Sequence, residues 1–314
     1  MKTQKLIFGI FTTVVFASLL SLTSCNKDED KSANNDNETS ATFVTLSQDE
    51  NYFEEEIDRI DDDANLFMMG GQLKSSEAGP CNATLDSVRI INDTIVYYIS
   101  YDGLNCNGKV HRTGNLEIRI KQGIFWVQPG ASIKVKIINY TVTRPKMGKT
   151  TILNGEKILT NVTGGHVGLL GITYDTIIHE MTGSFQMTFD DNTTRTWNIA
   201  RRKTFTGTAT NMDISIEGLA TSGEYTSLVC WGQNRKGDDF YTQIIQPVIL
   251  KQSCDFDPIL GQKKHSIPSK SATSTVTFGY NDNNQPIGEG ECPTKYRLDW
   301  EHNGNSGTVY LFLH

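Results

Sequence analysis

Most of the chain from Cys81 onward alternates between apolar and polar residues. Apolar side chains occupy every second position in 133–137, 185–189 and 197–199. A period of two places one side of a strand against a core and the other in water, so the pattern predicts a mainly β protein. Half-exposed strands are typical of antiparallel sheets, and nothing between them has the pattern of a crossover helix. We therefore expect an antiparallel sheet or a β-sandwich, with which an apolar content of only 37% agrees.

Two polar segments are predicted to be turns of this sheet. Asn154-Gly155 is a dipeptide typical of two-residue hairpin turns. Asp190-Asp191-Asn192-Thr193 separates two alternating segments and predicts a second hairpin.

One short amphipathic helix is predicted, over residues 47–71. Ser47 opens a capping box, and apolar residues follow at helical spacing at positions 53, 57, 60 and 64. Gly70-Gly71 ends the pattern. We expect the apolar stripe to pack on the sheet and the acidic face, which includes Asp61-Asp62-Asp63, to be solvated.

The N-terminus is predicted to be a signal peptide over residues 1–24. Lys2 and Lys5 precede the apolar run from Leu6 to Leu20, which is shorter than the roughly 20 residues of a membrane-spanning helix. Leu22-Thr23-Ser24-Cys25 then resembles a bacterial lipobox, which implies acylation of Cys25. The sequence therefore predicts a triacyl anchor at Cys25.

Residues 25–46 are predicted to form a flexible tether, because they are rich in Asn, Asp and Ser. Lys27 followed by acidic residues resembles the export signal of surface lipoproteins, so we expect a lipid anchor in the outer membrane and exposure on the cell surface. Removal of residues 1–24 leaves 27 basic and 36 acidic residues, a net charge of −9. This charge argues against a nucleic-acid partner.

Five cysteines remain besides Cys25, in a compartment that permits disulfides. We expect disulfides Cys81–Cys106 and Cys254–Cys292, because each pair brackets a similar β-like run with a polar turn. Cys230 is expected to be a buried thiol. On this basis residues 79–250 form the main β domain, and residues 251–314 form a C-terminal β unit that partly repeats 81–120.

Several short motifs resemble a family of uncharacterised Bacteroidetes lipoproteins. They are Gly79-Pro80-Cys81, Gly103-Leu104-Asn105-Cys106, the Asp191 to Arg201 segment with Thr196-Trp197-Asn198, Ser253-Cys254, and Gly290-Glu291-Cys292. The resemblance covers most of the mature chain and implies a surface lipoprotein, but such families carry no established activity to transfer. It leaves open the role of the glycine-rich loop from Gly164 to Gly168.

No catalytic, metal or cofactor site is predicted. His179-Glu180 matches the start of a zinc-protease motif, but Gly183 stands where the second histidine belongs, and the segment has a strand pattern. Trp126, Trp197 and Trp300 are candidate platforms for stacking on sugar rings, although strand packing explains them as well.

The leading hypothesis is a non-catalytic surface lipoprotein, a binding or structural module for a glycan or a protein. Two alternatives remain: a lipid carrier with a groove along a curved sheet, and a glycan hydrolase of the cell envelope. Exposed tryptophans favour glycan binding, a long apolar cavity favours lipid carriage, and acids converging in a cleft favour the hydrolase.

Overall fold

The computed structural model describes residues 28–69, 80–106, 108–145 and 148–313. These ranges contain the helix α1 (Asp28–Met69), fifteen strands and three short 3-10 turns. The strands are β1 (Ala83–Ile91), β2 (Thr94–Leu104), β3 (His111–Lys121), β4 (Ala131–Arg144), β5 (Lys149–Asn161), β6 (Thr176–Phe189), β7 (Thr194–Thr208), β8 (Asn211–Gly218), β9 (Ala220–Ser222), β10 (Tyr225–Gln233), β11 (Asp239–Lys251), β12 (Asp257–Ile267), β13 (Ala272–Tyr280), β14 (Lys295–His302) and β15 (Asn305–Phe312). The 3-10 turns are η2 (Val167–Leu169), η3 (Gln252–Cys254) and η4 (Pro268–Lys270).

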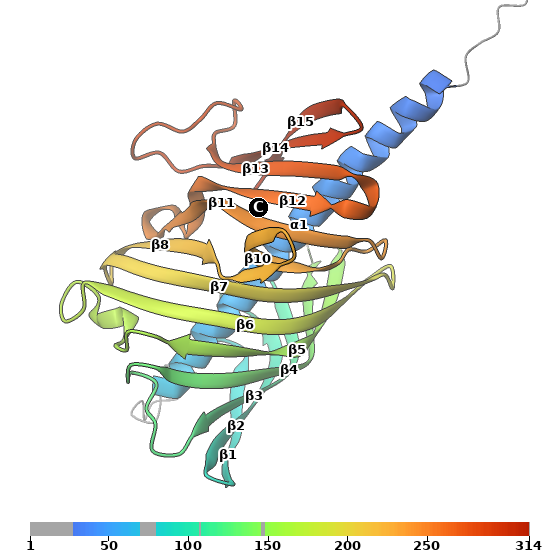
Figure 1. Ribbon diagram of the computed structural model, residues 1–314. Helices are drawn as coiled ribbons and strands as arrows, with labels where there is room; N and C mark the ends of the chain where they lie inside the picture. The colour runs from blue at the N-terminus through green and yellow to red at the C-terminus, as the bar shows by residue number, and fades with distance from the viewer. Residues whose placement is uncertain (1–27, 70–79, 107, 146–147, 314) are drawn as a thin grey trace, which may run out of the picture.

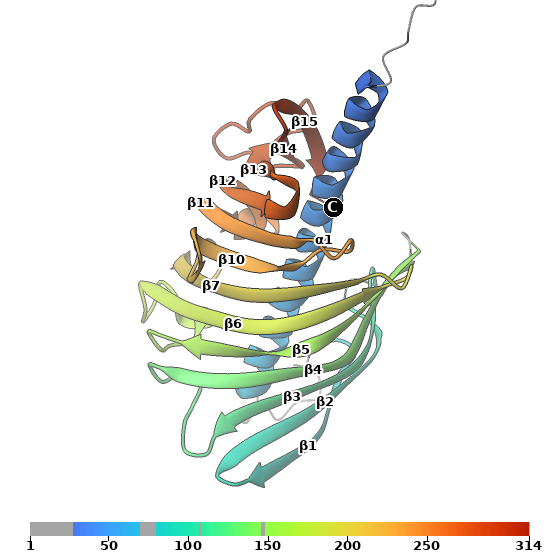
Figure 2. The ribbon, with the colours of Figure 1, turned by 45° about the vertical axis from the view of Figure 1, so that its right-hand side comes forward.

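All fifteen strands belong to one sheet, in which neighbouring strands pair antiparallel. The predicted mainly β, antiparallel architecture is therefore confirmed. The sheet curves around α1, which crosses its concave face (Figures 1 and 2). β11 (Asp239–Lys251) pairs with β12 (Asp257–Ile267), so the strands after residue 250 continue the same sheet.

The hydrophobic core lies between α1 and the concave face. In β4, Ile133, Val135 and Ile137 are buried, while Ser132, Lys134 and Lys136 are exposed. The alternation in the sequence thus follows the two faces of the sheet. From the helix, the apolar positions 43, 46, 53, 57, 60 and 64 complete the core.

Asn154-Gly155 does not form a hairpin turn, contrary to the prediction. Both residues lie inside β5. A Cβ atom on Gly155 would lie 2.3 Å from the backbone oxygen of Ser184, so glycine is needed there for the close approach of β6. The Asn154 side chain accepts a hydrogen bond of 2.7 Å from the backbone N–H of Asn139, where β4 and β5 change register. The predicted turn between β6 and β7 does form, at residues 190–193.

The helix already includes Asp28, nineteen residues before the predicted start at Ser47. The part of the predicted tether from residue 28 to residue 46 is therefore helical. Phe43 and Leu46 extend the apolar stripe toward the N-terminus and are buried. Ser47 lies within the helix and donates a hydrogen bond of 3.3 Å to the Tyr296 hydroxyl. Contacts with distant strands thus stabilise a segment whose composition alone predicts disorder.

The acidic face of α1 is not simply solvated, which corrects the second expectation for the helix. Basic side chains of the sheet, and Arg235 of the turn between β10 and β11, form ion pairs with it. They pair Asp49 with Arg235, Glu50 and Glu54 with Lys263, Glu56 with Arg144, Asp58 with Arg201 and Lys203, Asp61 with Lys157, and Asp63 with Arg112. Lys157, Arg201 and Lys263 are at most 3% exposed, so these pairs are part of the core.

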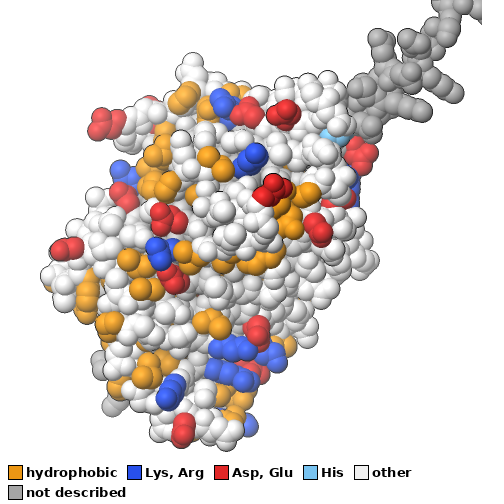
Figure 3. Space-filling model, in the orientation of Figure 1, with side chains coloured by type: hydrophobic (Ala, Val, Ile, Leu, Met, Phe, Trp, Pro, Cys, Tyr) orange, Lys and Arg blue, Asp and Glu red, His pale blue; other side chains and the backbone are white. Residues whose placement is uncertain are grey.

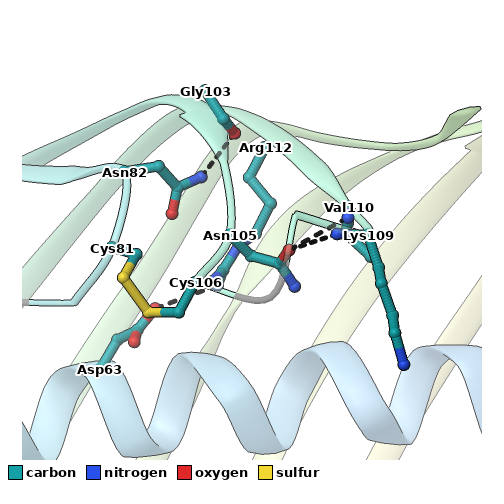
Figure 4. The surroundings of a disulfide bond; sticks show 9 residues. All are labelled: Asp63, Cys81, Asn82, Gly103, Asn105, Cys106, Lys109, Val110 and Arg112. Atoms are coloured by element: carbon teal, nitrogen blue, oxygen red, sulfur yellow. Dashed lines mark hydrogen bonds and ion pairs between the residues drawn. A yellow bond between two sulfur atoms is a disulfide. The ribbon is translucent and has the colours of Figure 1, made fainter.

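Both disulfides link the cysteines that the sequence pairs, Cys81 with Cys106 and Cys254 with Cys292. Cys81 precedes β1 and Cys106 follows β2, so the first disulfide closes the open end of that hairpin beside α1 (Figure 4). The Asn82 side chain reinforces it with a hydrogen bond of 2.8 Å to the backbone oxygen of Gly103. Cys230 is a buried free thiol, as expected.

Candidate functional site

The candidate site is a cavity of about 370 Å³ between the C-terminal half of α1 and the concave face of the sheet. Strands β5 to β8 and β11 supply its walls, together with Trp126 and the loop that contains η2. The apolar lining residues are Leu66, Trp126, Leu159, Val167, Met181, Phe205, Met212, Ile214, Leu250 and Phe256. The volume lies within the roughly 300–1,000 Å³ of typical ligand pockets.

A second cavity of about 300 Å³ adjoins the first along the helix. Asp58, Asp62, Leu250 and Phe256 line both, so the two cavities are neighbours along α1, and we call them together the helix groove. On α1 the groove extends from Asn51 to Leu66, about 22 Å at 1.5 Å per residue. This is longer than one leaflet of the hydrocarbon core of a bilayer, about 15 Å.

His179 brings an unpaired polar atom to this apolar wall. The side chain is 5% exposed, and its Nε2 has no hydrogen-bond partner among the described residues. The ring contacts those of Trp126 and Phe205, with centroids 5.3 and 5.1 Å away. Burial, together with the positive charge of Lys203, lowers the pKa of His179 to about 4. At neutral pH the imidazole is therefore uncharged, and Nε2 is a buried polar atom without a partner behind the apolar wall of the cavity.

Three aspartates of α1 face the same cavity. Asp58 pairs with Arg201 and with Lys203, whose Nζ lies 2.7 Å from Oδ1, and Asp61 pairs with Lys157. Asp62 lies at the mouth with an exposed side chain. Neighbouring protein atoms displace water from the carboxyl, which disfavours its charged form, and the negative charges of the neighbouring aspartates act in the same direction. Together they raise its pKa to about 7 in spite of Lys203. The acids and bases of the cavity thus nearly balance, which suits an uncharged ligand.

The glycine-rich loop whose role the sequence leaves open shapes the mouth of this cavity. Gly164 and Gly165 have φ values of 75° and 89°, a backbone conformation that favours glycine. A Cβ atom at Gly164 would lie 2.7 Å from Pro129, and one at Gly165 would lie 2.8 Å from the Tyr174 ring. Asn161 holds the loop with hydrogen bonds from its amide nitrogen to the backbone oxygens of Trp126 and Gly165, 3.0 and 2.9 Å long.

The three candidate stacking tryptophans do not come together. Trp197 is fully buried against Phe53, with ring centroids 4.1 Å apart, and so has no face for a sugar. Trp126 is 4% exposed and lines the helix groove. Trp300 is half-buried on β14. This arrangement counts against glycan stacking at these positions.

The predicted lipid-attachment residue, Cys25, lies outside the described residues, as do Lys27, Gly70-Gly71 and Gly79. His179 and the aspartates of α1 were not predicted as site residues. The sequence contains no local signal that they share a cavity, since they come from elements more than a hundred residues apart.

Among the described residues, no group of three or more His, Cys, Asp or Glu side chains is placed to hold a metal ion. Within the same ranges, no helix has both the length and the apolar composition needed to cross a membrane.

No protein-family model, curated protein or solved structure matches this chain.

Proposed function

We propose that this chain is a non-catalytic, lipid-anchored surface protein of the outer membrane that binds the apolar chain of a lipid in the helix groove. The observation that carries the proposal is the groove itself. It combines a largely apolar lining and the length of an acyl chain with one buried imidazole nitrogen that lacks a partner.

The chemistry of the groove favours a lipid with an uncharged, hydrogen-bonding head. An acyl chain would bury its methylene groups against residues such as Leu159, Met181 and Phe205, at about 0.8 kcal/mol per methylene. A rotation of the His179 ring on ligand binding would let its unpaired Nε2, which is buried in the free chain, form a hydrogen bond with a hydroxyl or ester group of that lipid. The lysines and arginines that line the groove already form ion pairs with acids of α1, so an anionic head would find no free cation there.

The N-terminal features support the location in this proposal. Cys25, in its lipobox-like sequence, would anchor the chain in the membrane, and the lysine and acidic residues after it resemble a surface-export signal. The resemblance to Bacteroidetes lipoproteins supports the same location.

A tryptophan at position 250 should block the groove. Leu250 lines both cavities, so the larger side chain of Leu250→Trp would occupy the place of the ligand. We expect at least a tenfold weaker affinity for N-phenyl-1-naphthylamine, an uncharged fluorescent probe, measured by titration and by displacement with monopalmitoyl glycerol.

Ile249→Trp is the matched control, because residue 249 does not line the groove and pairs with Leu260, whose side chain is exposed. Equal affinity of Leu250→Trp and the unmodified chain would refute the proposed site.

Probe binding should become tighter as the pH falls from 8 to 6. A ligand beside Asp62 excludes water and thus favours the neutral carboxyl, whose pKa is about 7 without ligand. One proton is taken up, so the change is a few-fold and at most about tenfold per pH unit. Asp62→Asn should remove this dependence, and Asp213→Asn, on the strand β8 that borders the groove, should retain it. A dependence that persists in Asp62→Asn would assign it to another group.

A glycan hydrolase is a second candidate, because a carboxyl with a pKa near 7 in a cleft is suited to general acid catalysis. The ion pairs of Asp58 and Asp61 weaken it, since a glycosidase also needs a second carboxylate for the nucleophile or base. Release of nitrophenol from nitrophenyl glycosides, lost in Asp62→Asn, would favour the hydrolase over lipid binding.

A glycan or protein ligand, which the sequence favoured, has less support. The residues best suited to sugar stacking are buried at positions 126 and 197.

A further inference from the structure

Two loops beside the helix groove expose an unusual number of apolar side chains. They are residues 122–130, between β3 and β4, and residues 162–175, between β5 and β6, and we call them together the apolar rim. Phe125 is 67% and Ile172 is 79% exposed, and Ile124, Val127 and Leu169 are exposed as well. The loops lie at the left of Figure 1, where the space-filling view shows hydrophobic side chains at the surface (Figure 3).

The apolar rim is almost without charge. Residues 122–130 contain no Asp, Glu, Lys, Arg or His, and residues 162–175 contain only His166 and Asp175 of these types. Partial burial lowers the pKa of His166, so this side chain is neutral at pH 7. In a chain of which 21% is charged, such a surface is poorly suited to water and well suited to an apolar phase.

The two loops form one structure that is continuous with the groove. The backbone N–H of Gly165 donates a hydrogen bond of 2.8 Å to the backbone oxygen of Val127. Trp126, Gly165, His166 and Val167 belong to the rim and also line the cavity. Apolar surface therefore extends from the exposed tips to the interior of the groove.

We propose that the apolar rim inserts into a lipid surface, through which the ligand enters or leaves the helix groove. The proposal rests on the proposed function and adds where the ligand comes from. The exposed side chains stand at the tips of two loops and carry no charge for a specific protein contact, so we favour lipid over a protein partner. Insertion would remove Phe125 and Ile172 from water together and place the mouth of the groove at the acyl chains.

The test uses the unacylated chain from Asn26 onward, so that no anchor contributes. We expect this chain to sediment with vesicles of phosphatidylcholine and, to a similar extent, with vesicles that also contain phosphatidylglycerol. The double substitution Phe125→Ser and Ile172→Ser should lower the partition coefficient at least tenfold, because two large apolar side chains no longer leave water.

The matched control is Ile245→Ser with Leu260→Ser, two side chains that are 51% and 58% exposed on β11 and β12. This variant should bind vesicles like the unmodified chain. The proposal is overturned if the unmodified chain does not bind vesicles, or if the rim variant and the control bind equally well. Binding only to vesicles with phosphatidylglycerol would also overturn it, since attraction by charge would then replace insertion.

Probe binding in solution separates this proposal from the proposed function. The rim variant should bind N-phenyl-1-naphthylamine normally, since Phe125 and Ile172 do not line the groove, and this binding also shows that it folds. Leu250→Trp should lose the probe and retain the vesicles. If vesicles bind through the rim but no probe binds the unmodified chain, lipid docking stands and the ligand proposal fails. If the probe binds but the rim variant binds vesicles as well as the unmodified chain does, the ligand proposal stands and lipid docking fails.

Discussion

Replacing Lys263 with methionine is expected to lower the free energy of unfolding by about 3–5 kcal/mol, measured by chemical denaturation. The Lys263 Nζ lies 3.1 Å from Oε1 of Glu50 and 2.7 Å from Oε2 of Glu54. Glu50 is 1% exposed, so removal of the lysine leaves a buried carboxylate without its nearest cation. Methionine keeps much of the apolar volume, which separates the loss of charge from a loss of packing.

Lys264→Met is the control, because the side chain of this adjacent residue points to the other face of β12 and is half-buried. It should change the stability by no more than about 0.5 kcal/mol. Adding Glu50→Gln to Lys263→Met should recover part of the loss, since the unpaired charge is then absent. If Lys263→Met and Lys264→Met have similar effects, the ion pairs do not hold α1 in the sheet.

The ion pair of Glu50 with Lys263 makes the free energy of unfolding depend on pH in acid. Burial alone would raise the pKa of Glu50, but Lys263, His265 and Arg195 outweigh it and lower the pKa from 4.5 to about 2. The stabilisation from this carboxylate is therefore complete above pH 4.5 and is lost as the pH falls toward 2. In Lys263→Met this part of the acid sensitivity should be smaller.

Replacing Phe53 with alanine is expected to cost about 3–5 kcal/mol, because it leaves a cavity in the centre of the core. Phe53 is 1% exposed. Its ring stacks on Trp197 at 4.1 Å between centroids and contacts the edge of Phe185 at 5.2 Å. These contacts seat the middle of α1 on β6 and β7, so both thermal unfolding and proteolysis of the helix should respond to the substitution.

Phe125→Ala is the matched control for this prediction. It removes the same side chain from an exposed loop, where it should change the stability by no more than about 0.5 kcal/mol. A loss in Phe53→Ala as small as that in Phe125→Ala would mean that the helix does not contribute to the core.

The parts of the fold that follow from local patterns could be predicted from the sequence. Alternation identified strands such as β4, because a pleated strand with one buried face requires a period of two. The disulfide partners were also expected, since each pair brackets a hairpin. The prediction of a turn at Asn154-Gly155 was wrong, because glycine is suited both to a turn and to a close approach between strands.

The groove and its polar groups could not be predicted in the same way. The pairing of Asp58 with Arg201 joins residues 143 positions apart, and neither segment carries a sign of the other. His179 stood out only as half of an incomplete zinc motif. Its position beside Trp126 and Phe205 depends on how the curved sheet folds around the helix.

The sequence by itself determined that this protein is built from antiparallel strands with two disulfide-closed hairpins, because periodicity and the spacing of cysteines act over short stretches of chain. Only the tertiary structure decided that α1 includes residues 28–46, which charges its acidic face meets, and that a groove remains beside it. These properties depend on contacts between distant segments, because the free energy of burying a charge or an apolar surface depends on which groups of the folded chain lie against it.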